Sequence, residues 1–131
     1  MARKAIEFGR YPWFPAHGYG YIHPSNRRDF EAIVPHDKVF EKIDENERWL
    51  LLQYGHKQFK VEPELYSPVA PLPFSFGDKV EEVNRTPGQL RLRGEIFNIF
   101  WHPAEDQAYF QIRQGKQEIE RHFRADELRP M

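Results

Sequence analysis

Cysteine is absent from this chain of 131 residues. Its absence excludes a disulfide framework, a thiolate nucleophile and a cysteine-ligated zinc site. Serine is scarce as well, and the chain contains no Gly-Ser elbow, HExxH pair, phosphate-binding loop or dinucleotide-binding glycine pattern. We therefore expect a protein that is not an enzyme and that uses no cofactor.

Long apolar runs are also lacking. The longest, such as residues 49–52, extend over only a few residues and are flanked by charge. The basic start of the chain is interrupted by Glu7, Gly9 and Arg10 before an apolar run of signal-peptide length develops. The sequence therefore predicts a cytoplasmic protein with no membrane segment.

The chain has no excess of charge of one sign. Its 19 basic and 20 acidic residues give a formal net charge of −1. This balance excludes the global positive charge of a protein that binds nucleic acid through many phosphate contacts, but it does not exclude a local basic patch. Hydrophobic residues make up 40% and aromatic residues 15% of the chain, which predicts an ordered core rather than disorder.

Residues 11–24, with the sequence YPWFPAHGYGYIHP, form an aromatic opening. Its prolines and glycines exclude a regular helix and a central strand, so we expect an ordered arm. Its rings are rich in contact area and are candidate binding anchors. An arm that covers the exposed strand edges of the protein explains them equally well. The five rings are Tyr11, Trp13, Phe14, Tyr19 and Tyr21.

The clearest helical pattern follows this opening. Phe30, Ile33 and Val34 lie at helical spacing after Ser25, and Pro35 stops the pattern, which predicts one short α-helix near residues 26–34. The segments KVFEKI and RWLLLQY then flank the polar residues 44–47 and predict a hairpin, and the alternation in QFKV predicts a further strand.

Three closely spaced prolines then predict an extended connection between two β-units. We expect an N-terminal unit over residues 1–70, with the aromatic arm, the helix and strands, and a C-terminal unit over residues 71–131. In the second unit we expect a turn and a strand at FGDKVEEV, and strands at LRLRGEIFNIFWH with an interruption at Gly94, at AYFQIRQ and at EIERHFRA. RTPG, AEDQ and GKQ are predicted turns. The three prolines are Pro68, Pro71 and Pro73.

A weak internal repeat links the two halves. In each, an aromatic-led strand, a glycine turn and a phenylalanine-bearing strand precede Glu-Leu and proline, which indicates two small, related β-units that pack together. The first set is Trp49, Gly55, Phe59, Val61, Glu64, Leu65 and Pro68; the second is Tyr109, Gly115, Phe123, Ala125, Glu127, Leu128 and Pro130.

The segments FGDKV, GEIFNIFWH, AYFQI and FRADELRP resemble the small SH3-like β-barrels of the KOW and Tudor type. The resemblance covers residues 74–131 and, more loosely, residues 36–70. It implies five short strands in each barrel, a glycine that bends the second strand and a helical turn before the last strand. The segment DELRPM leaves little chain for this last strand. The chain is also similar to uncharacterised bacterial proteins with a YPWF-like opening. The expected fold is mainly β: two small SH3-like barrel units packed together, with one short α-helix.

The stretch NRTPGQLRLRG alternates cations with leucines on a predicted strand. Aromatic neighbours such as Phe97, Phe100 and Trp101 offer rings on which bases stack, and the KOW resemblance implies RNA or ribosomal partners. A strand with one buried and one solvated face explains the same alternation. Candidate binding residues in this half are Arg91, Arg93, Trp101 and Tyr109.

The histidines lack the short spacings that place two ligands on one metal, so no metal site is predicted. His23 and His102 each precede a proline and would serve as an acid and base pair in a small hydrolase. Local hydrogen bonding at strand ends explains them as well. The six histidines are His17, His23, His36, His56, His102 and His122.

An acidic cluster surrounds the predicted hairpin turn. By analogy, a face of this kind is used by antitoxin or immunity proteins that block a basic nuclease site, whereas an ordinary solvated turn needs no partner. Its members are Glu41, Asp44, Glu45 and Glu47.

Taken together, these patterns predict a noncatalytic macromolecular binding module whose partner is another protein, not identified by the sequence. Three alternatives stay open: an RNA- or ribosome-associated binding protein, an antitoxin- or immunity-type inhibitor, and a small hydrolase. Small barrels often pair through edge strands, so we expect a monomer or a homodimer.

Overall fold

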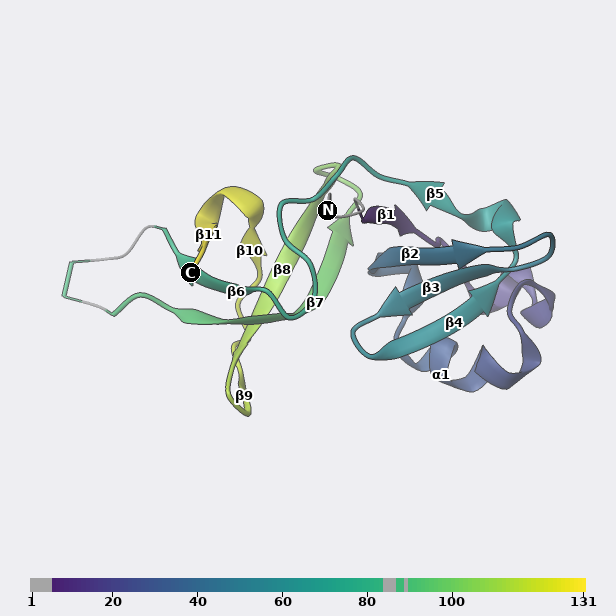
Figure 1. The fold of residues 1–131 in the computed structure, drawn as a ribbon, viewed down its shortest axis with the longest axis horizontal. Helices are drawn as coiled ribbons and strands as arrows, with labels where there is room; N and C mark the ends of the chain where they lie inside the picture. Colours follow the sequence, from purple (N-terminus) through teal and green to yellow (C-terminus); the bar gives the residue numbers. More distant parts are fainter. Residues whose placement is uncertain (1–5, 84–86, 89) are drawn as a thin grey trace, which may run out of the picture. The chain divides into compact units, whose positions relative to one another are not determined.

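The structure of the protein is a computed structural model, which describes residues 6–83, 87–88 and 90–131. The contacts divide it into unit 1, Met1–Pro71, and unit 2, Leu72–Met131, and each unit contains one sheet (Figure 1). The predicted boundary was placed at residues 70/71. Two residues of the predicted turn RTPG, Arg85 and Thr86, lie outside the described residues, and Pro87 and Gly88 lie in a turn. None of the helices in the described part of the chain is long and apolar enough to cross a membrane.

The sheet of unit 1 has five strands in the order β4-β3-β2-β1-β5. All of its neighbours are antiparallel. A 3-10 turn, Pro63–Leu65, joins the fourth strand to the fifth. The strands are β1 (Glu7–Arg10), β2 (Val39–Glu45), β3 (Leu50–Tyr54), β4 (Lys57–Val61) and β5 (Ser67–Pro68).

Alternation along the strands forms the core of unit 1. In β3, Leu50, Leu52 and Tyr54 are buried while the residues between them are partly exposed. Phe59 in β4 lies opposite Leu52 and is buried with it. The strand period of two therefore places one face of the predicted hairpin in the interior.

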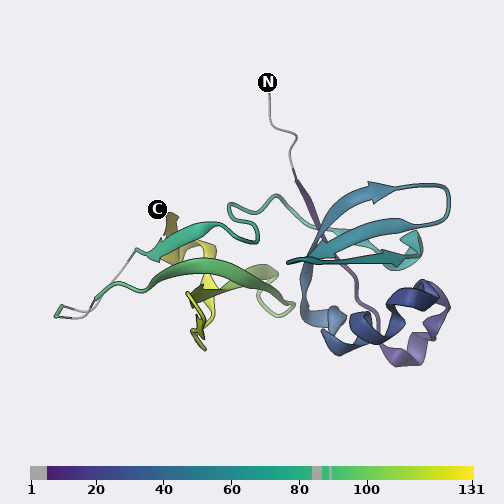
Figure 2. The same cartoon turned by 60° about the horizontal axis from the view of Figure 1, so that its bottom comes forward.

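The segment between β1 and β2 completes this core rather than forming a separate arm. It contains the helix α1 (Arg27–Ala32) and four 3-10 turns, and both views show these turns on one side of the sheet (Figures 1 and 2). The ring of Phe30 on α1 contacts Tyr11, Trp13, Phe40 and Phe59. The turns are Pro15–His17, Tyr19–Tyr21, Pro24–Asn26 and Pro35–Asp37.

The outer edge of β4 is covered by residues that precede α1. The backbone N–H of His23 donates to the carbonyl of Lys60 at 2.9 Å. The N–H of Glu62 donates to the carbonyl of Tyr21 at 2.7 Å. Asn26 Oδ1 accepts from the N–H of Lys60 at 2.8 Å. Unpaired strand edges promote aggregation, so in unit 1 this segment performs the covering role that the sequence suggested for the aromatic opening.

The sheet of unit 2 has the order β10-β8-β7-β6-β11, and β9 also pairs with β8. A 3-10 turn, Ala125–Glu127, precedes the last strand. The strands are β6 (Lys79–Glu82), β7 (Arg93–His102), β8 (Gln107–Gln114), β9 (Gln117–Glu118), β10 (Phe123–Arg124) and β11 (Leu128–Pro130).

Two features of β7 differ from the sequence prediction. The strand begins at Arg93, so Arg91 lies before it rather than within it. It also runs through Gly94, and its irregularity is a bulge between Ile96 and Asn98, at Phe97. Gly94 still permits a close approach, because a Cβ there would lie 2.5 Å from the carbonyl oxygen of Arg113.

The end of unit 2 also differs. Residues 119–122 are not strand, so the predicted strand EIERHFRA is reduced to the short β9 and β10. The little chain that DELRPM leaves for a final strand is sufficient for a short one, because β11 pairs with β6 through Leu128, Arg129 and Pro130. Leu128 is buried, and Pro130 is tolerated because only one side of the strand is paired to β6.

The two units share their strand order. We number the five main strands of each unit by their order in the chain and leave out β9. In both sheets these strands then lie side by side in the order fourth, third, second, first and fifth. In each, a 3-10 turn precedes the fifth strand and a bulge lies in the pairing of the second with the third strand. The predicted mainly β fold, with one short helix and two sheet-based units, is confirmed.

Candidate binding surfaces

Two of the five predicted anchor rings lie in the core of unit 1. Tyr11 and Trp13 are 0% and 1% exposed, so their assignment to an open binding surface was wrong. Each polar atom has a partner: Tyr11 Oη donates to the carbonyl of Glu62 at 2.7 Å, and Trp13 Nε1 donates to the carbonyl of Gly18 at 2.9 Å. Burial, and next the Glu62 carboxylate, raise the pKa of Tyr11 above its ordinary value.

The other three rings lie nearer the surface of unit 1. Phe14 is 45% exposed and its ring stacks on His36, with centroids 4.3 Å apart. Tyr19 is exposed and donates to Glu31 Oε1 at 2.9 Å, and Tyr21 is half-buried against His17. The Phe14 surface, as we name it, comprises Phe14, the imidazoles of His17 and His36 that stack on its ring, and the exposed Val34, which lies two residues before His36 in the chain.

Val34 in this surface has a strained backbone. Its φ of 54° lies in the left-handed region, which a β-branched residue rarely adopts. The side chain is also 44% exposed, so burial does not offset the strain. Strained, exposed residues of this kind are concentrated at functional sites, which makes the Phe14 surface a candidate interface.

A second group of rings lies on the outer face of β7 and β8 in unit 2. The ring centroids of Phe100 and His122 are 4.2 Å apart, and those of His102 and Tyr109 are 3.9 Å apart. The ring centroids of His102 and His122 are 6.5 Å apart, and this contact joins the two stacked pairs. We name Phe100, His102, Tyr109 and His122 the four-ring face.

Polar groups border the four-ring face. Tyr109 Oη and Gln107 Nε2 both donate to the Glu105 carboxylate. The hydrogen bond from Tyr109 lowers the pKa of Glu105, and the same bond raises the pKa of Tyr109. Farther along the strands, Asn98 Nδ2 donates to Gln111 Oε1 at 3.0 Å.

Register explains which rings meet on this face. Phe100 lies opposite Tyr109, and residues opposite one another project to the same side of a sheet. Trp101 lies opposite the buried Ala108, so it projects to the other side and does not join Tyr109. His122 lies in the segment between β9 and β10, and no sequence periodicity places it beside Phe100. Of the four-ring face, the sequence therefore predicts Tyr109 as a candidate binding residue, and it does not predict His102 or His122 as candidates for binding.

The predicted arginines lie at the other end of β7. Arg93 Nε is 3.3 Å from Glu81 Oε2, and Arg129 Nε is 2.8 Å from Glu81 Oε1. The hydrogen bond from Arg129 lowers the pKa of Glu81. Arg91 is half-buried. These contacts neutralise part of the predicted basic stretch.

The two histidines that precede prolines have local contacts. His23 Nδ1 is held by Ser25 Oγ at 2.7 Å, and His102 stacks on Tyr109, so each has the local contacts expected of a structural histidine. No group of His, Asp and Glu able to hold a metal occurs in the part of the chain that the structure describes. In the acidic cluster Glu41 is buried at 7% exposure, which removes it from the predicted exposed face. Lys42 pairs with Glu45 at 3.0 Å.

The comparisons with known proteins give a family but no activity. A family model described as a family of unknown function, DUF6960, matches residues 1–129. The match covers nearly the whole chain, so the chain belongs to this family. No curated protein matches it, and no solved structure matches it.

Proposed function

We propose that this member of the DUF6960 family is a noncatalytic binding protein of the bacterial cytoplasm, built from two SH3-like barrels, whose partner is another protein. The shared strand order, with a 3-10 turn before the fifth strand of each unit, supports the barrel assignment. The same order supports the internal repeat. Proteins of this fold differ widely in what they bind, so the function is argued from surface residues.

The Phe14 surface carries the proposal. It combines an exposed phenylalanine, two imidazoles and a strained, exposed valine. Aromatic side chains supply large contact area at interfaces, and fully desolvated rings at their centres contribute much of the binding energy. Because Phe14 is already stacked on His36, its ring is oriented before binding, which lowers the entropy cost of association.

The test is affinity capture with the tagged full-length protein, followed by binding measurements with the purified partner. We expect Phe14→Ala to weaken the complex at least tenfold, as loss of an interface anchor does. Leu90→Ala serves as the control, because Leu90 is 90% exposed and lies in unit 2. Equal affinity of the Phe14→Ala variant and the unchanged protein would contradict the proposal.

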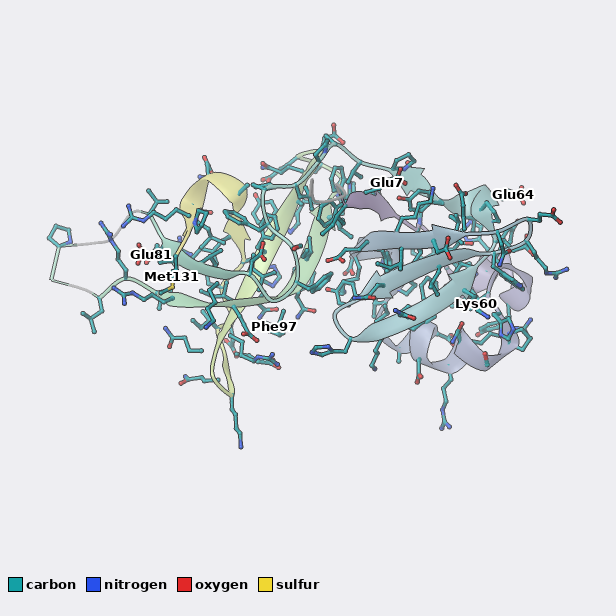
Figure 3. All side chains as sticks on the ribbon, in the orientation of Figure 1. Glu7, Lys60, Glu64, Glu81, Phe97 and Met131 are labelled. Atoms are coloured by element: carbon teal, nitrogen blue, oxygen red, sulfur yellow. The ribbon has the colours of Figure 1, made fainter. Side chains whose placement is uncertain are left out.

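A second candidate function is binding of single-stranded RNA, and the four-ring face favours it. Stacked rings, an adjacent amide pair at Asn98 and Gln111, and the Arg113 guanidinium 5.6 Å from the Phe97 ring form a strip along β7 and β8. Figure 3 shows the side chains along these strands, with Phe97 labelled. Rings and cations in one strip suit bases and phosphates.

Fluorescence anisotropy with labelled single-stranded RNA at low and high salt tests this second function. Binding that weakens with salt and is reduced at least fivefold by Phe100→Ala supports it, because each stacked base contributes about 1–3 kcal/mol. Absence of binding at low salt removes RNA as a candidate.

A further inference from the structure

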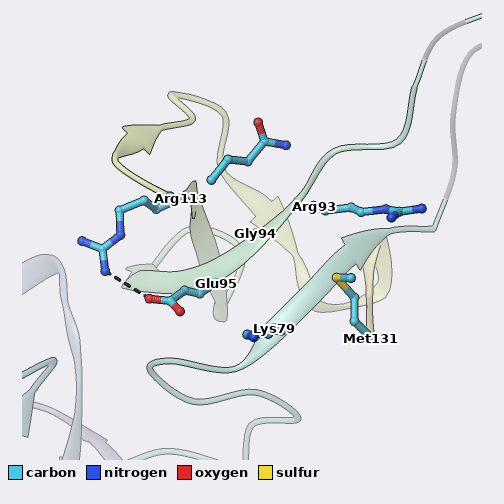
Figure 4. A pocket seen from close by; sticks show the side chains of 8 residues that line it. Lys79, Arg93, Gly94, Glu95, Arg113 and Met131 are labelled. Atoms are coloured by element: carbon cyan, nitrogen blue, oxygen red, sulfur yellow. Dashed lines mark hydrogen bonds and ion pairs between the residues drawn. The ribbon is translucent and has the colours of Figure 1, made fainter.

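A hollow of about 380 Å³ lies in unit 2 over the beginning of β7, where this strand runs between β6 and β8. It occupies the outer face of the sheet, because the alternate residues Val80 and Glu82 of β6 are buried on the opposite side. Figure 4 shows the residues that surround it. The lining comprises Lys79, Arg93, Gly94, Glu95, Arg113, Gln114, Gly115 and Met131.

The side chains of this lining carry a positive excess. Lys79, Arg93 and Arg113 are cations, and Glu95 is the one carboxylate among the lining side chains. Arg113 Nη2 lies 3.2 Å from Glu95 Oε1 (Figure 4). Lys79 lies opposite Glu95 in the register, but no ion pair of Lys79 occurs among the described residues. Arg93 Nε also lies 3.3 Å from Glu81 Oε2, and Arg129 Nε lies 2.8 Å from the other oxygen of the same carboxylate. When this pair is counted with the lining, the four cationic side chains exceed the two carboxylate side chains by two positive charges.

The shape of the lining suits a ligand with a small organic part. Gly94 and Gly115 contribute backbone only, so the aliphatic stems of Lys79 and Arg113 and the side chain of Met131 supply the walls. A volume of about 380 Å³ lies at the low end of the range for small-molecule sites.

We propose that this hollow binds a phosphomonoester, the dianionic phosphate of a small organic molecule. A dianion matches the excess of two positive charges, and the planar guanidinium of Arg93 or Arg113 is suited to bidentate contact with phosphate oxygens. Glu95 already orients Arg113, so this cation is positioned before the ligand arrives. The site rests on Lys79, Arg93 and Arg113 and is independent of the protein partner proposed above.

The experiment is an NMR titration of the ¹⁵N-labelled full-length protein with phenyl phosphate, inorganic phosphate and benzoate. We expect saturable shifts of the Gly94 and Gly115 amides with phenyl phosphate. Inorganic phosphate should bind several-fold more weakly because it makes no contact with the apolar walls. Benzoate, which has one charge, should bind at least fivefold more weakly than phenyl phosphate. Absence of saturable shifts at both glycines would overturn the proposal.

Three charge variants distinguish binding at this hollow from nonspecific electrostatic attraction to the protein surface. Lys79→Gln should weaken phenyl phosphate binding about fivefold, the effect of one unit charge close to the ligand in water. Glu95→Gln should strengthen it by a similar factor, a gain that misfolding does not produce. Lys116→Gln removes the same charge from the neighbouring turn, outside the lining, and should leave affinity within twofold. Equal losses for Lys79→Gln and Lys116→Gln, or no gain for Glu95→Gln, would refute a defined site.

The phosphate group has two sources, a free small molecule or a phosphorylated side chain of another protein. A phosphoserine peptide and a 5′-mononucleotide, titrated in parallel, distinguish them. Tighter binding of the mononucleotide supports a free small molecule, and tighter binding of the peptide supports a phosphorylated partner. Failure of both, together with phenyl phosphate, would exclude the phosphomonoester site, while capture of a partner through the Phe14 surface would be unaffected.

Discussion

Gly94 shows how one missing side chain permits a close strand approach. An alanine Cβ would lie 2.5 Å from the carbonyl oxygen of Arg113, a backbone atom that moves only with β8. We expect Gly94→Ala to lower the free energy of unfolding by about 1–3 kcal/mol, the usual cost of overpacking. Urea denaturation measures the change. Gly20→Ala is the control, because nothing lies within 4 Å of its Cβ position, and it should not be destabilising. Equal stability of both variants would contradict this steric argument.

Val34 should show the opposite effect. Asparagine tolerates the left-handed region better than valine, so Val34→Asn should relieve strain and raise the free energy of unfolding by about 1 kcal/mol. Thermal denaturation measures the gain. If the Phe14 surface binds a partner, the same variant should bind it more weakly, because an exposed apolar contact is lost. A variant that is less stable than the unchanged protein would show that Val34 has compensating contacts.

Two tyrosines should make the protein sensitive to alkali. Burial raises the pKa of Tyr11 and of Tyr66, and the hydrogen bond from Tyr66 to Glu7 adds to the second shift. Because the folded-state pKa exceeds the unfolded value of about 10, the stability contribution is complete below pH 10. It falls as the pH rises above 10 towards the folded-state pKa, since the unfolded chain releases these protons more readily.

Unfolding experiments between pH 8 and 12, with tyrosinate absorbance recorded in parallel, test this alkaline loss. The double variant Tyr11→Phe/Tyr66→Phe should be less stable at pH 8, because Tyr11 Oη no longer donates to the Glu62 carbonyl. Its stability should also fall less steeply above pH 10. A slope identical to that of the unchanged protein would show that other groups cause the alkaline loss.

At the scale of elements, the outer edge of β4 is covered in part by the side chain of Asn26, which is distant from β4 in the sequence. Asn26 stands at the start of α1 but makes no capping hydrogen bond, and its Oδ1 accepts from Lys60 N instead. Asn26→Ala should destabilise the protein by about 1 kcal/mol and accelerate its aggregation, because an edge N–H loses its partner. Light scattering during mild heating measures the second effect. Arg28→Ala on the exposed side of α1 is the control, and equal aggregation of the two variants would contradict this role.

Elements defined by local patterns were predictable from the sequence. The helix near Phe30 and the alternating strand that contains Phe59 follow from spacing alone. The bulge at Phe97 and the short final strand at Leu128 were not predictable, because both depend on pairing with a distant partner. The rings illustrate the same limit. Burial of Trp13 and the meeting of Phe100 with His122 arise from tertiary packing, which sequence periodicity does not encode.

At the scale of the whole molecule, the two units share one strand order but differ in where their aromatic rings lie. In unit 1 the connection between the first and second strands contains α1 and rings such as Trp13, which complete the core. In unit 2 the described residues between the first and second strands form no helix, and the candidate binding features lie on the sheet itself.

The pairing of β6 with β11 has a mechanical consequence. The chain enters the sheet of unit 2 through β6 and leaves it through β11, and Val80 lies opposite Pro130. In unit 1 the entering and leaving strands also pair, with Gly9 opposite Pro68. Tension applied to the ends of either unit therefore loads its hydrogen bonds one after another rather than in parallel. Bonds loaded in this way break at lower force than bonds sheared together, so we expect a protease or translocase that pulls on the ends of either unit to meet little resistance.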